Sequence, residues 1–290
     1  MIQDIEPLVY DNVWRKEEAG EEDIVLAYDG KTSFMKTDGD GSVSFPTVAE
    51  YPFRHALTYL FSISGKRYFW DESGETPSLP GFAFRGTGDF RTAQPKVNAF
   101  AGVTGWQLAN WYRSRAYCGR CGAKTRRSDR ERMVVCPECG QTEYPKLCPA
   151  VIIGVCDGDR IVLTQYAGRT VTHYSLVAGF TEIGETLEET VAREVMEEVG
   201  LHVKNVRYYK SQPWSFTDTV LMGFFCDLDG DDAIRMDSHE LKTAKWVAKE
   251  DIAVDYQDLS LTNEMICYFA GKLPAYVTER TRRNALYGVR

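Results

Sequence analysis

The sequence has no apolar run long enough to cross a membrane, and Met1 to Glu6 lack the positive charge and the apolar core of a signal peptide. It also has no internal repeat and no low-complexity segment. The net charge of -8 argues against a general affinity for polyanions. A chain of 290 residues, 43% of them hydrophobic, is long enough for two or more domains. We therefore expect a globular, cytoplasmic, multidomain protein with no membrane partner.

Basic residues are outnumbered over the whole chain but are concentrated in one segment. Between residues 113 and 132, eight basic residues stand against only two acidic ones. The eight are Arg113, Arg115, Arg120, Lys124, Arg126, Arg127, Arg130 and Arg132. A patch of this density could follow a phosphate backbone.

Four of the eight cysteines form two CxxC pairs separated by 14 residues, at Cys118 and Cys121 and at Cys136 and Cys139. This spacing is typical of a zinc ribbon, in which four thiolates bind one tetrahedral Zn²⁺. No open ligand position is implied, so the zinc is expected to be structural. The alternative is a thioredoxin-like redox motif, but no strand-to-helix turn surrounds either pair. The remaining cysteines have apolar neighbours and are predicted to be buried thiols, namely Cys148, Cys156, Cys226 and Cys267.

A helix is predicted from Thr186 to Val199, because Thr186 can cap its start and Gly200 suits a left-handed residue at its end. At about 100° per residue, its acids fall within one arc of roughly 100°. They are Glu194, Glu197 and Glu198. A second arc is apolar and is expected to face the core, with Val191, Ala192, Val195, Met196 and Val199.

Three carboxylates this close repel one another by up to about 4 kcal/mol per pair at an effective dielectric near 20. A divalent cation would reverse that cost, and oxygen ligands favour Mg²⁺ or Mn²⁺ over Zn²⁺. Because Mg²⁺ usually acts together with substrate phosphates, the cluster indicates phosphoryl chemistry. Glu185 and Arg193 are expected to form an ion pair that pins the preceding loop. The alternative is a solvated acidic surface on an ordinary amphipathic helix.

Residues 179–201 fit the pattern G-x5-E-x7-R-E-U-x-E-E-x-G-U, where U is apolar, at every specified position. Chance would produce such a match at on the order of 10⁻⁹ per start position. The segment resembles the signature of the Nudix hydrolases, which cleave a diphosphate attached to a further group. The resemblance implies catalytic roles for Glu185, Arg193, Glu194, Glu197 and Glu198.

A second segment, Ser211 to Thr219, narrows the resemblance. Together with the four cysteines it is similar to the NADH pyrophosphatase family, whose motif S-Q-P-W-P-F-P-x-S is changed here at Ser215, Thr217 and Thr219. The two lost prolines would loosen a loop whose φ angles they fix. The alternative is an aromatic loop that covers the core. The resemblance implies that the substrate is bound by Gln212, Pro213, Trp214, Ser215, Phe216, Thr217, Asp218 and Thr219.

The same resemblance implies that Tyr144 and Phe180 sandwich a base of the dinucleotide, since base stacking is worth about 1 to 3 kcal/mol. Each ring could instead belong to the core. The resemblance also implies that the Ala178 carbonyl and Glu240 complete the metal site of Glu194 and Glu198, with Glu197 as a further ligand. For Glu240, the alternative is an exposed loop acid.

We expect three domains: an N-terminal α+β domain (1–112), a zinc ribbon (113–143) and a Nudix domain (144–290). The first contains a helix from about Lys96 to Tyr112. In the last, a mixed β-sheet between helices is expected from the Nudix fold. Its strand-like runs are 150–155, 161–165 and 219–226, and a last helix is expected near 261–270.

The resemblance predicts hydrolysis of NADH or NAD⁺ to AMP and nicotinamide mononucleotide with Mg²⁺ or Mn²⁺, removal of 5′ NAD caps from RNA, and a homodimer. One rival is a Nudix hydrolase of ADP-ribose or a dinucleoside polyphosphate. The other is a zinc-ribbon protein that binds nucleic acid and has an inactive Nudix fold.

Overall fold

The computed structural model describes residues 1–168 and 174–287, with side chains as far as residue 281. The chain divides into two compact units. The N-terminal unit comprises Ile2–Leu147 together with Ser215–Asp218. The C-terminal unit comprises Met1, Cys148–Trp214 and the residues from Thr219 onward. Among the described residues, no helix combines the length and the hydropathy needed to cross a membrane.

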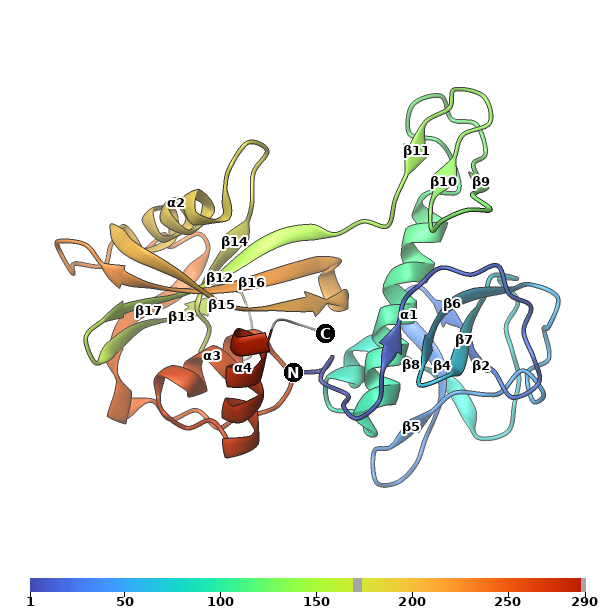
Figure 1. Ribbon diagram of the computed structural model, residues 1–290, viewed down its shortest axis with the longest axis horizontal. Helices are drawn as coiled ribbons and strands as arrows, with labels where there is room; N and C mark the ends of the chain where they lie inside the picture. The colour runs from blue at the N-terminus through green and yellow to red at the C-terminus, as the bar shows by residue number, and fades with distance from the viewer. Residues whose placement is uncertain (169–173, 288–290) are drawn as a thin grey trace. The chain divides into compact units, whose positions relative to one another are not determined.

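The N-terminal unit contains two four-stranded sheets and one long helix (Figure 1). The first sheet has the order β1 (Tyr10–Asp11), β6 (Leu57–Ile63), β7 (Lys66–Asp71) and β2 (Ile24–Leu26). The second joins β3 (Tyr28–Asp29), β4 (Thr32–Thr37) and β5 (Val43–Ser44), with β8 (Phe82–Gly86) also paired to β4. A short 3-10 helix, Thr87–Arg91, precedes helix α1, Lys96–Ser114. The predicted helix from Lys96 is therefore confirmed and is two residues longer than expected.

Helix α1 packs closely because two glycines face its neighbours. A Cβ atom at Gly102 would lie 2.4 Å from the Phe90 ring, and one at Gly105 would lie 2.4 Å from Leu26. The Tyr28 hydroxyl donates a hydrogen bond to the Gly102 carbonyl at 2.7 Å. The backbone of α1 thus lies closer to the strands than any larger residue at these positions would permit.

The cysteine-rich segment forms a small antiparallel sheet of β9 (Arg126–Arg127), β10 (Val134–Val135) and β11 (Thr142–Glu143). Arg127 pairs with Glu72 of the N-terminal domain at 2.6 Å. Arg132 donates to the carbonyls of Leu60 and Asn12. These contacts join the ribbon and the N-terminal domain within one compact unit.

The C-terminal unit is built on a six-stranded mixed sheet. Its strands are β12 (Cys148–Asp157), β13 (Arg160–Tyr166), β14 (Val177–Phe180), β15 (Val203–Trp214), β16 (Thr219–Leu228) and β17 (Leu241–Ala248). The order is β15-β16-β12-β13-β17, and β14 pairs with β12. Strands β12 and β16 are parallel, and the other pairs are antiparallel. The three strand runs expected from the sequence lie within β12, β13 and β16.

Helices cover both faces of this sheet, as expected (Figure 1). Helix α2 (Leu187–Val199) covers one face, and helix α3 (Leu261–Phe269) covers the other. A 3-10 helix, Lys249–Asp251, follows β17, and α4 (Ala275–Tyr287) follows α3.

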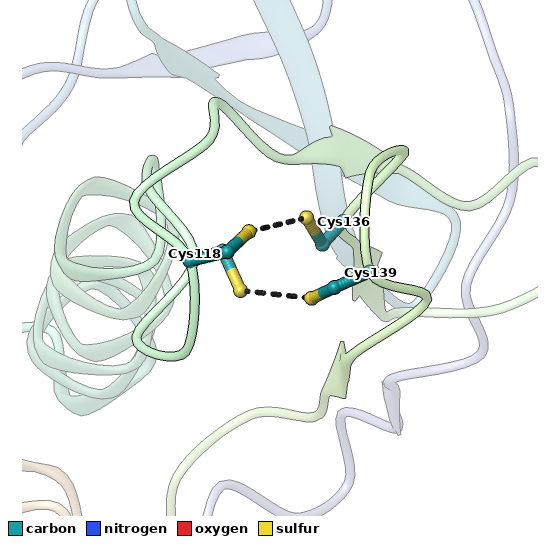
Figure 2. Close-up of side chains that lie close together, drawn as sticks. Cys118, Cys136 and Cys139 are labelled. Carbon is teal, nitrogen blue, oxygen red and sulfur yellow. Dashed lines mark hydrogen bonds between the residues drawn. The ribbon is translucent and has the colours of Figure 1, made fainter.

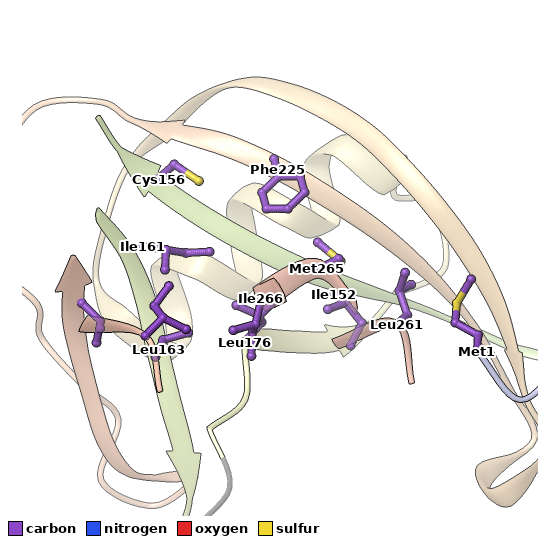
Figure 3. Close-up of a cluster of buried hydrophobic side chains, with 12 residues drawn as sticks. Met1, Ile152, Cys156, Ile161, Leu163, Leu176, Phe225, Leu261, Met265 and Ile266 are labelled. Carbon is purple, nitrogen blue, oxygen red and sulfur yellow. The ribbon is translucent and has the colours of Figure 1, made fainter. Parts of the chain in front are cut away.

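Alternate residues of β12 pack into two hydrophobic cores, one on each face of the sheet. Val151 and Ile153 pack toward α2, whereas Ile152 packs with Met265 and Ile266 of α3 (Figure 3). This period of two is the one expected for a strand buried on both faces. The sheet is therefore a rigid support for α2 and for β14 beside it.

Candidate functional site

Helix α2 begins and ends where the sequence predicts. The Thr186 hydroxyl accepts a hydrogen bond from the Glu189 amide at 3.2 Å, and the Glu189 carboxylate accepts one from the Thr186 amide at 2.8 Å. This capping box satisfies two backbone donors at the start of the helix. Gly200 ends the helix at φ 69°, a conformation that suits glycine.

The buried face of α2 differs from the expected one. Val191, Val195 and Val199 are buried as predicted, but Ala192 and Met196 are exposed. Glu194 and Glu198, expected on a separate acidic arc, are 9% and 2% exposed. The helix is rotated so that two carboxylates share the buried face with the valines.

Arg193 binds acidic residues of both helix α2 and the loop before it. Its guanidinium donates to both Glu185 carboxylate oxygens, at 2.6 and 2.9 Å, so the predicted ion pair is present. It also donates to Glu194 at 2.8 Å, to Glu197 at 2.9 Å and to the Phe180 carbonyl at 2.9 Å. Hydrogen bonds from Arg193 lower the pKa of Glu185 to about 2, and those acids raise the pKa of Arg193. One guanidinium therefore joins the loop, the helix and the end of β14.

Gly179 of β14 lies directly against the Glu194 carboxylate. A Cβ atom at this position would lie 1.9 Å from the carboxyl carbon of Glu194. Only glycine leaves room for that carboxylate, which gives the first residue of the 179–201 pattern a physical reason.

Glu198 carries the strongest sign that the site is built for a cation. Its Oε2 atom is buried and has no hydrogen-bond partner among the described residues. Burial, together with the nearby charges of Glu194, Glu240 and Asp237, raises its pKa to about 8, against a hydrogen bond from the Ala178 amide. Burial also raises the pKa of Glu194.

A divalent cation would relieve this repulsion and give Glu198 Oε2 a partner, so the carboxylates present fit such an ion. Glu240 is exposed in the turn before β17, yet its charge affects both Glu194 and Glu198. Within the described part of the chain, these acids do not converge as closely as the four cysteines do. Glu194 and Glu197 are instead drawn to Arg193. Asp237, which faces Glu198, was not predicted because no motif marks it.

The segment 211–219 forms the end of the β15–β16 hairpin, with a 3-10 helix at Ser215–Thr217 and Asp218 at φ 56°. Gln212 is fully buried. Its side-chain amide donates to the Leu259 carbonyl at 3.0 Å and accepts from the Leu261 amide at 2.7 Å. Gln212 therefore holds the start of α3 from inside the C-terminal unit.

The other residues of this segment differ in exposure. Ser215 and Thr219 are buried, Trp214, Phe216 and Asp218 are half-buried, and Pro213 and Thr217 are exposed. Within the N-terminal unit, the Arg91 guanidinium lies 4.4 Å from the centre of the Phe216 ring.

Both aromatic rings expected at the base are on the surface of their units. Tyr144, in the N-terminal unit, is 55% exposed, and Phe180, in the C-terminal unit, is 54% exposed. The Tyr144 hydroxyl donates to Glu131 at 3.2 Å. The alternative that either ring belongs to a core is therefore wrong.

The four cysteines of the ribbon converge as predicted (Figure 2). Their sulfurs all lie within 4.8 Å of one another, with Cys118 and Cys139 3.6 Å apart and Cys121 and Cys136 3.5 Å apart. A tetrahedron with Zn–S bonds of about 2.3 Å has edges of about 3.8 Å, so the cluster fits structural zinc. Hydrogen bonds from the Cys121 and Arg120 amides lower the pKa of Cys118 to about 6, which favours the thiolate that zinc requires.

The other four cysteines lie outside this cluster. Cys156, Cys226 and Cys267 are buried as expected, and burial raises the pKa of both Cys156 and Cys226 to about 12. Cys148 is only half-buried. The prediction for Cys148 was wrong because the residue lies at the first position of β12, before that strand enters the core.

Half of the basic segment is occupied by internal contacts. Arg113 donates to the Tyr28 carbonyl, Arg115 lies 3.8 Å from Glu143, and Arg127 and Arg132 bind the N-terminal domain. In the described part of the chain, the remaining four residues have no ion pair within 4.0 Å and are exposed. They are Arg120, Lys124, Arg126 and Arg130. The basic surface is thus smaller than the charge count indicated.

Comparison with known families identifies two stretches of the chain. Residues 113–144 match the NADH pyrophosphatase zinc ribbon domain, and residues 146–268 match the NUDIX domain. The zinc ribbon and the Nudix fold expected from the sequence motifs are therefore confirmed.

Curated relatives align with about half of the chain. A protein from Pectobacterium atrosepticum named NAD-capped RNA hydrolase NudC is 44% identical over 142 residues, which cover 49% of this chain and 54% of that protein. A protein of the same name from Escherichia coli K12 is 41% identical over 148 residues, or 51% of this chain and 57% of that protein. The chain thus spans about half the length of the curated relatives it matches. A solved Nudix hydrolase from Nitrosomonas europaea is 22% identical, with a TM-score of 0.45, and the match covers 53% of this chain and 89% of that one.

Proposed function

The chain carries the zinc ribbon of the NADH pyrophosphatases and a Nudix domain, and from this premise we propose that it hydrolyses the diphosphate bond of NADH and NAD⁺. The products are AMP and the reduced or oxidised nicotinamide mononucleotide. We propose that it also removes 5′ NAD caps from RNA, the activity named for the relatives in Pectobacterium and Escherichia coli. The observation that carries the proposal is the buried Glu198 carboxylate, whose Oε2 has no partner among the described residues.

In this proposal, Mg²⁺ or Mn²⁺ is held by Glu194, Glu198, Glu240 and the Ala178 carbonyl, with Glu197 as a further ligand. When bound, such an ion neutralises charge on a diphosphate and lowers the pKa of a water molecule.

The protein's own residues set up this site before any substrate arrives. Arg193 fixes Glu185, Glu194 and Glu197 relative to one another, so their carboxylates do not have to be ordered during the reaction. Because Glu194 and Glu198 are buried, little bulk water screens their charges, which strengthens their electrostatic interactions with a bound cation.

Substrate contacts are proposed for the two exposed aromatic rings and for the end of the β15–β16 hairpin. Tyr144 and Phe180 present free ring surface for stacking on a base. Pro213, Trp214 and the residues from Ser215 to Thr219 form the hairpin end, and Gln212 supports this segment from within rather than at its surface.

The direct test is to incubate the protein with NADH, ADP-ribose and NAD-capped RNA, with and without Mn²⁺, and to identify the products by mass. AMP together with reduced nicotinamide mononucleotide from NADH is the expected result. Turnover of ADP-ribose alone would favour the rival Nudix specificity, which Ser215 and Thr217 support because they replace two prolines of the family motif. No metal-dependent turnover would favour the binding-protein rival.

The contribution of the basic ribbon to capped RNA can be tested at residues whose side chains form no ion pair in the described part of the chain. Arg127 is unsuitable, because its ion pair with Glu72 holds the unit together. We expect R120E/R130E to lose activity on capped RNA and to keep activity on NADH, because phosphate contacts away from the cap act only on the RNA. Equal losses on both substrates would count against this role.

The proposal also includes a homodimer. Light scattering coupled to gel filtration should give twice the 32.9 kDa mass of the chain. A single-chain mass would remove the dimer from the proposal and leave the reaction untouched.

A further inference from the structure

The N-terminal unit contains a cavity of about 280 Å³ that none of the proposed catalytic residues lines. It lies where β7, helix α1 and the ribbon meet. The charged residues that line it are Glu72, Arg113, Lys124, Arg126 and Arg127. Two aromatic side chains, Trp70 and Tyr112, also line it.

The charge of this lining is strongly positive, with four cations against one carboxylate. Arg127 uses that carboxylate, since it binds both oxygens of Glu72 at 3.0 and 2.6 Å. Among the described residues, the Arg113 side chain donates only to a neutral carbonyl, that of Tyr28, at 2.6 Å. In the described ranges, Arg113, Lys124 and Arg126 have no carboxylate within 4.0 Å, and all three are exposed to solvent. Three positive charges therefore meet at one cavity with no carboxylate in ion-pair contact. The charges of Asp29 and Asp71 act on Arg113 and that of Asp129 acts on Arg126 only from a greater distance, so the arrangement is suited to a bound anion.

The aromatic residues hold two of the guanidinium groups in place. Trp70 and Tyr112 stack on each other, with ring centres 5.8 Å apart and planes 12° apart. The Arg127 guanidinium lies 4.5 Å from the centre of the Tyr112 ring, and that of Arg113 lies 5.4 Å from the Trp70 ring. Guanidinium planes held over aromatic rings are themselves surfaces on which a base can stack. The cavity thus combines sites for a phosphate with surfaces for a planar heterocycle.

We infer that this cavity binds one phosphate-bearing nucleotide, at a site distinct from the proposed catalytic site. Its volume of about 280 Å³ is just below the usual range of ligand pockets, about 300 to 1,000 Å³, and suits a mononucleotide better than a dinucleotide. Lys124 and Arg126 bind the phosphate, and the base lies against the guanidinium groups of Arg113 and Arg127. The nucleotide is either free or part of an RNA strand, and both share the chemistry that the cavity offers. The inference concerns binding alone and does not rest on the proposed hydrolysis.

The test is photolabelling of the full chain without added divalent metal, first with 8-azidoadenosine 5′-monophosphate and then with a short oligoadenylate that carries the same base. Peptides that contain Trp70 or Tyr112 should be labelled, and mass mapping separates them from any label in residues 146–268. Labelling by the mononucleotide identifies a free ligand, whereas labelling by the oligonucleotide alone identifies an RNA segment. Absence of label from these peptides with both probes would overturn the inference.

The variant K124E/R126E should reduce this labelling at least about tenfold, because two charge-assisted contacts to phosphate are reversed. Both side chains are exposed, so the fold should be kept, and zinc content and circular dichroism check this. The matched control is K31E/K66E, which reverses two exposed lysines of the same unit away from the cavity. Labelling that survives in K124E/R126E, or that falls equally in the control, would contradict the assignment.

Discussion

Glu198 combines deep burial with a carboxylate oxygen that has no partner among the described residues. Replacing it with glutamine should lower turnover on NADH by at least about 100-fold, since changes even beyond the direct ligands of a metal cost 10- to 100-fold. At a pH above about 8, where Glu198 is ionised, the same change should also raise the melting temperature in the absence of divalent metal, because it removes a buried charge that lies near Glu194 and Glu240. Steady-state kinetics and thermal unfolding measure the two effects.

The matched control for Glu198→Gln is Glu188→Gln. Glu188 lies on the same helix but is exposed, and no ion pair involves it in the described part of the chain. It should leave both turnover and the melting temperature near those of the unchanged protein. Near-normal activity of Glu198→Gln would refute the proposed role of that residue.

Gly179 offers a second test of the carboxylate site. A methyl group there would occupy the position of the Glu194 carboxylate, which is the far end of a long side chain and can be displaced without moving the backbone. Gly179→Ala should therefore displace Glu194 and weaken Mn²⁺ binding about 10- to 100-fold, with the free energy of unfolding reduced by no more than about 1 kcal/mol. Titration with Mn²⁺ and urea denaturation separate the two effects. Unchanged Mn²⁺ affinity would show that Glu194 does not bind the metal.

At the scale of the element, helix α2 shows which features of the site can be predicted from sequence. Its ends follow from local chemistry, namely the Thr186 capping box and the left-handed Gly200, and both were predicted. Its buried face was predicted only in part, with the three valines buried but Ala192 and Met196 exposed, because burial depends on how the helix lies on the sheet. The apolar arc of a helix does not predict its buried face where the function requires buried acids. Met196 is therefore exposed, while Glu198 is buried.

At the end of the β15–β16 hairpin too, long-range contacts could not be predicted from the sequence. Sequence identified the segment 211–219, but the partners of Gln212 are Leu259 and Leu261, more than 45 residues away. Nothing local to the motif indicates that its glutamine is an internal support.

The loop before α2 should make the stability of the fold depend on pH in the acidic range. Arg193 holds the pKa of Glu185 at about 2, below its usual 4.5. A carboxylate with a lowered pKa stabilises the fold above its unfolded pKa, and this contribution is lost as the pH falls from 4.5 through 2. Urea unfolding across this range should therefore show a smaller loss of stability for Glu185→Gln than for the unchanged protein. A Glu188→Gln control should follow the unchanged protein, and identical slopes for all three would contradict the role of this ion pair.

At the scale of the whole molecule, charge counted along the chain overestimates the charge available for binding. Arg127 and Arg132 belong to the basic segment by sequence, yet they bind residues 55 and 72 positions away. Four of the basic residues, Arg120, Lys124, Arg126 and Arg130, have side chains with no ion pair or hydrogen bond among the described residues. These four and the cavity beside Trp70 could be found only once the ribbon and the N-terminal domain were seen to form one compact unit.

That shared unit leads to a prediction about zinc. Zinc ribbons fold on binding their metal. Arg127 and Arg132 of the ribbon contact Glu72, which follows β7, and Leu60 of β6. Loss of the ribbon's fold should therefore destabilise these strands. Cys136→Ser should reduce bound zinc from one ion per chain to none and should lower the melting temperature of the N-terminal unit, while the C-terminal unit, with its own sheet and cores, keeps its melting temperature. Metal analysis and hydrogen exchange of each unit provide the measurements.

Cys148→Ser is the matched control, since this half-buried cysteine lies outside the cluster and should leave zinc and both units unchanged. A full zinc content in Cys136→Ser would show that the four cysteines do not act as one site, and a loss of exchange protection in both units would show that the C-terminal unit does not fold independently of the ribbon.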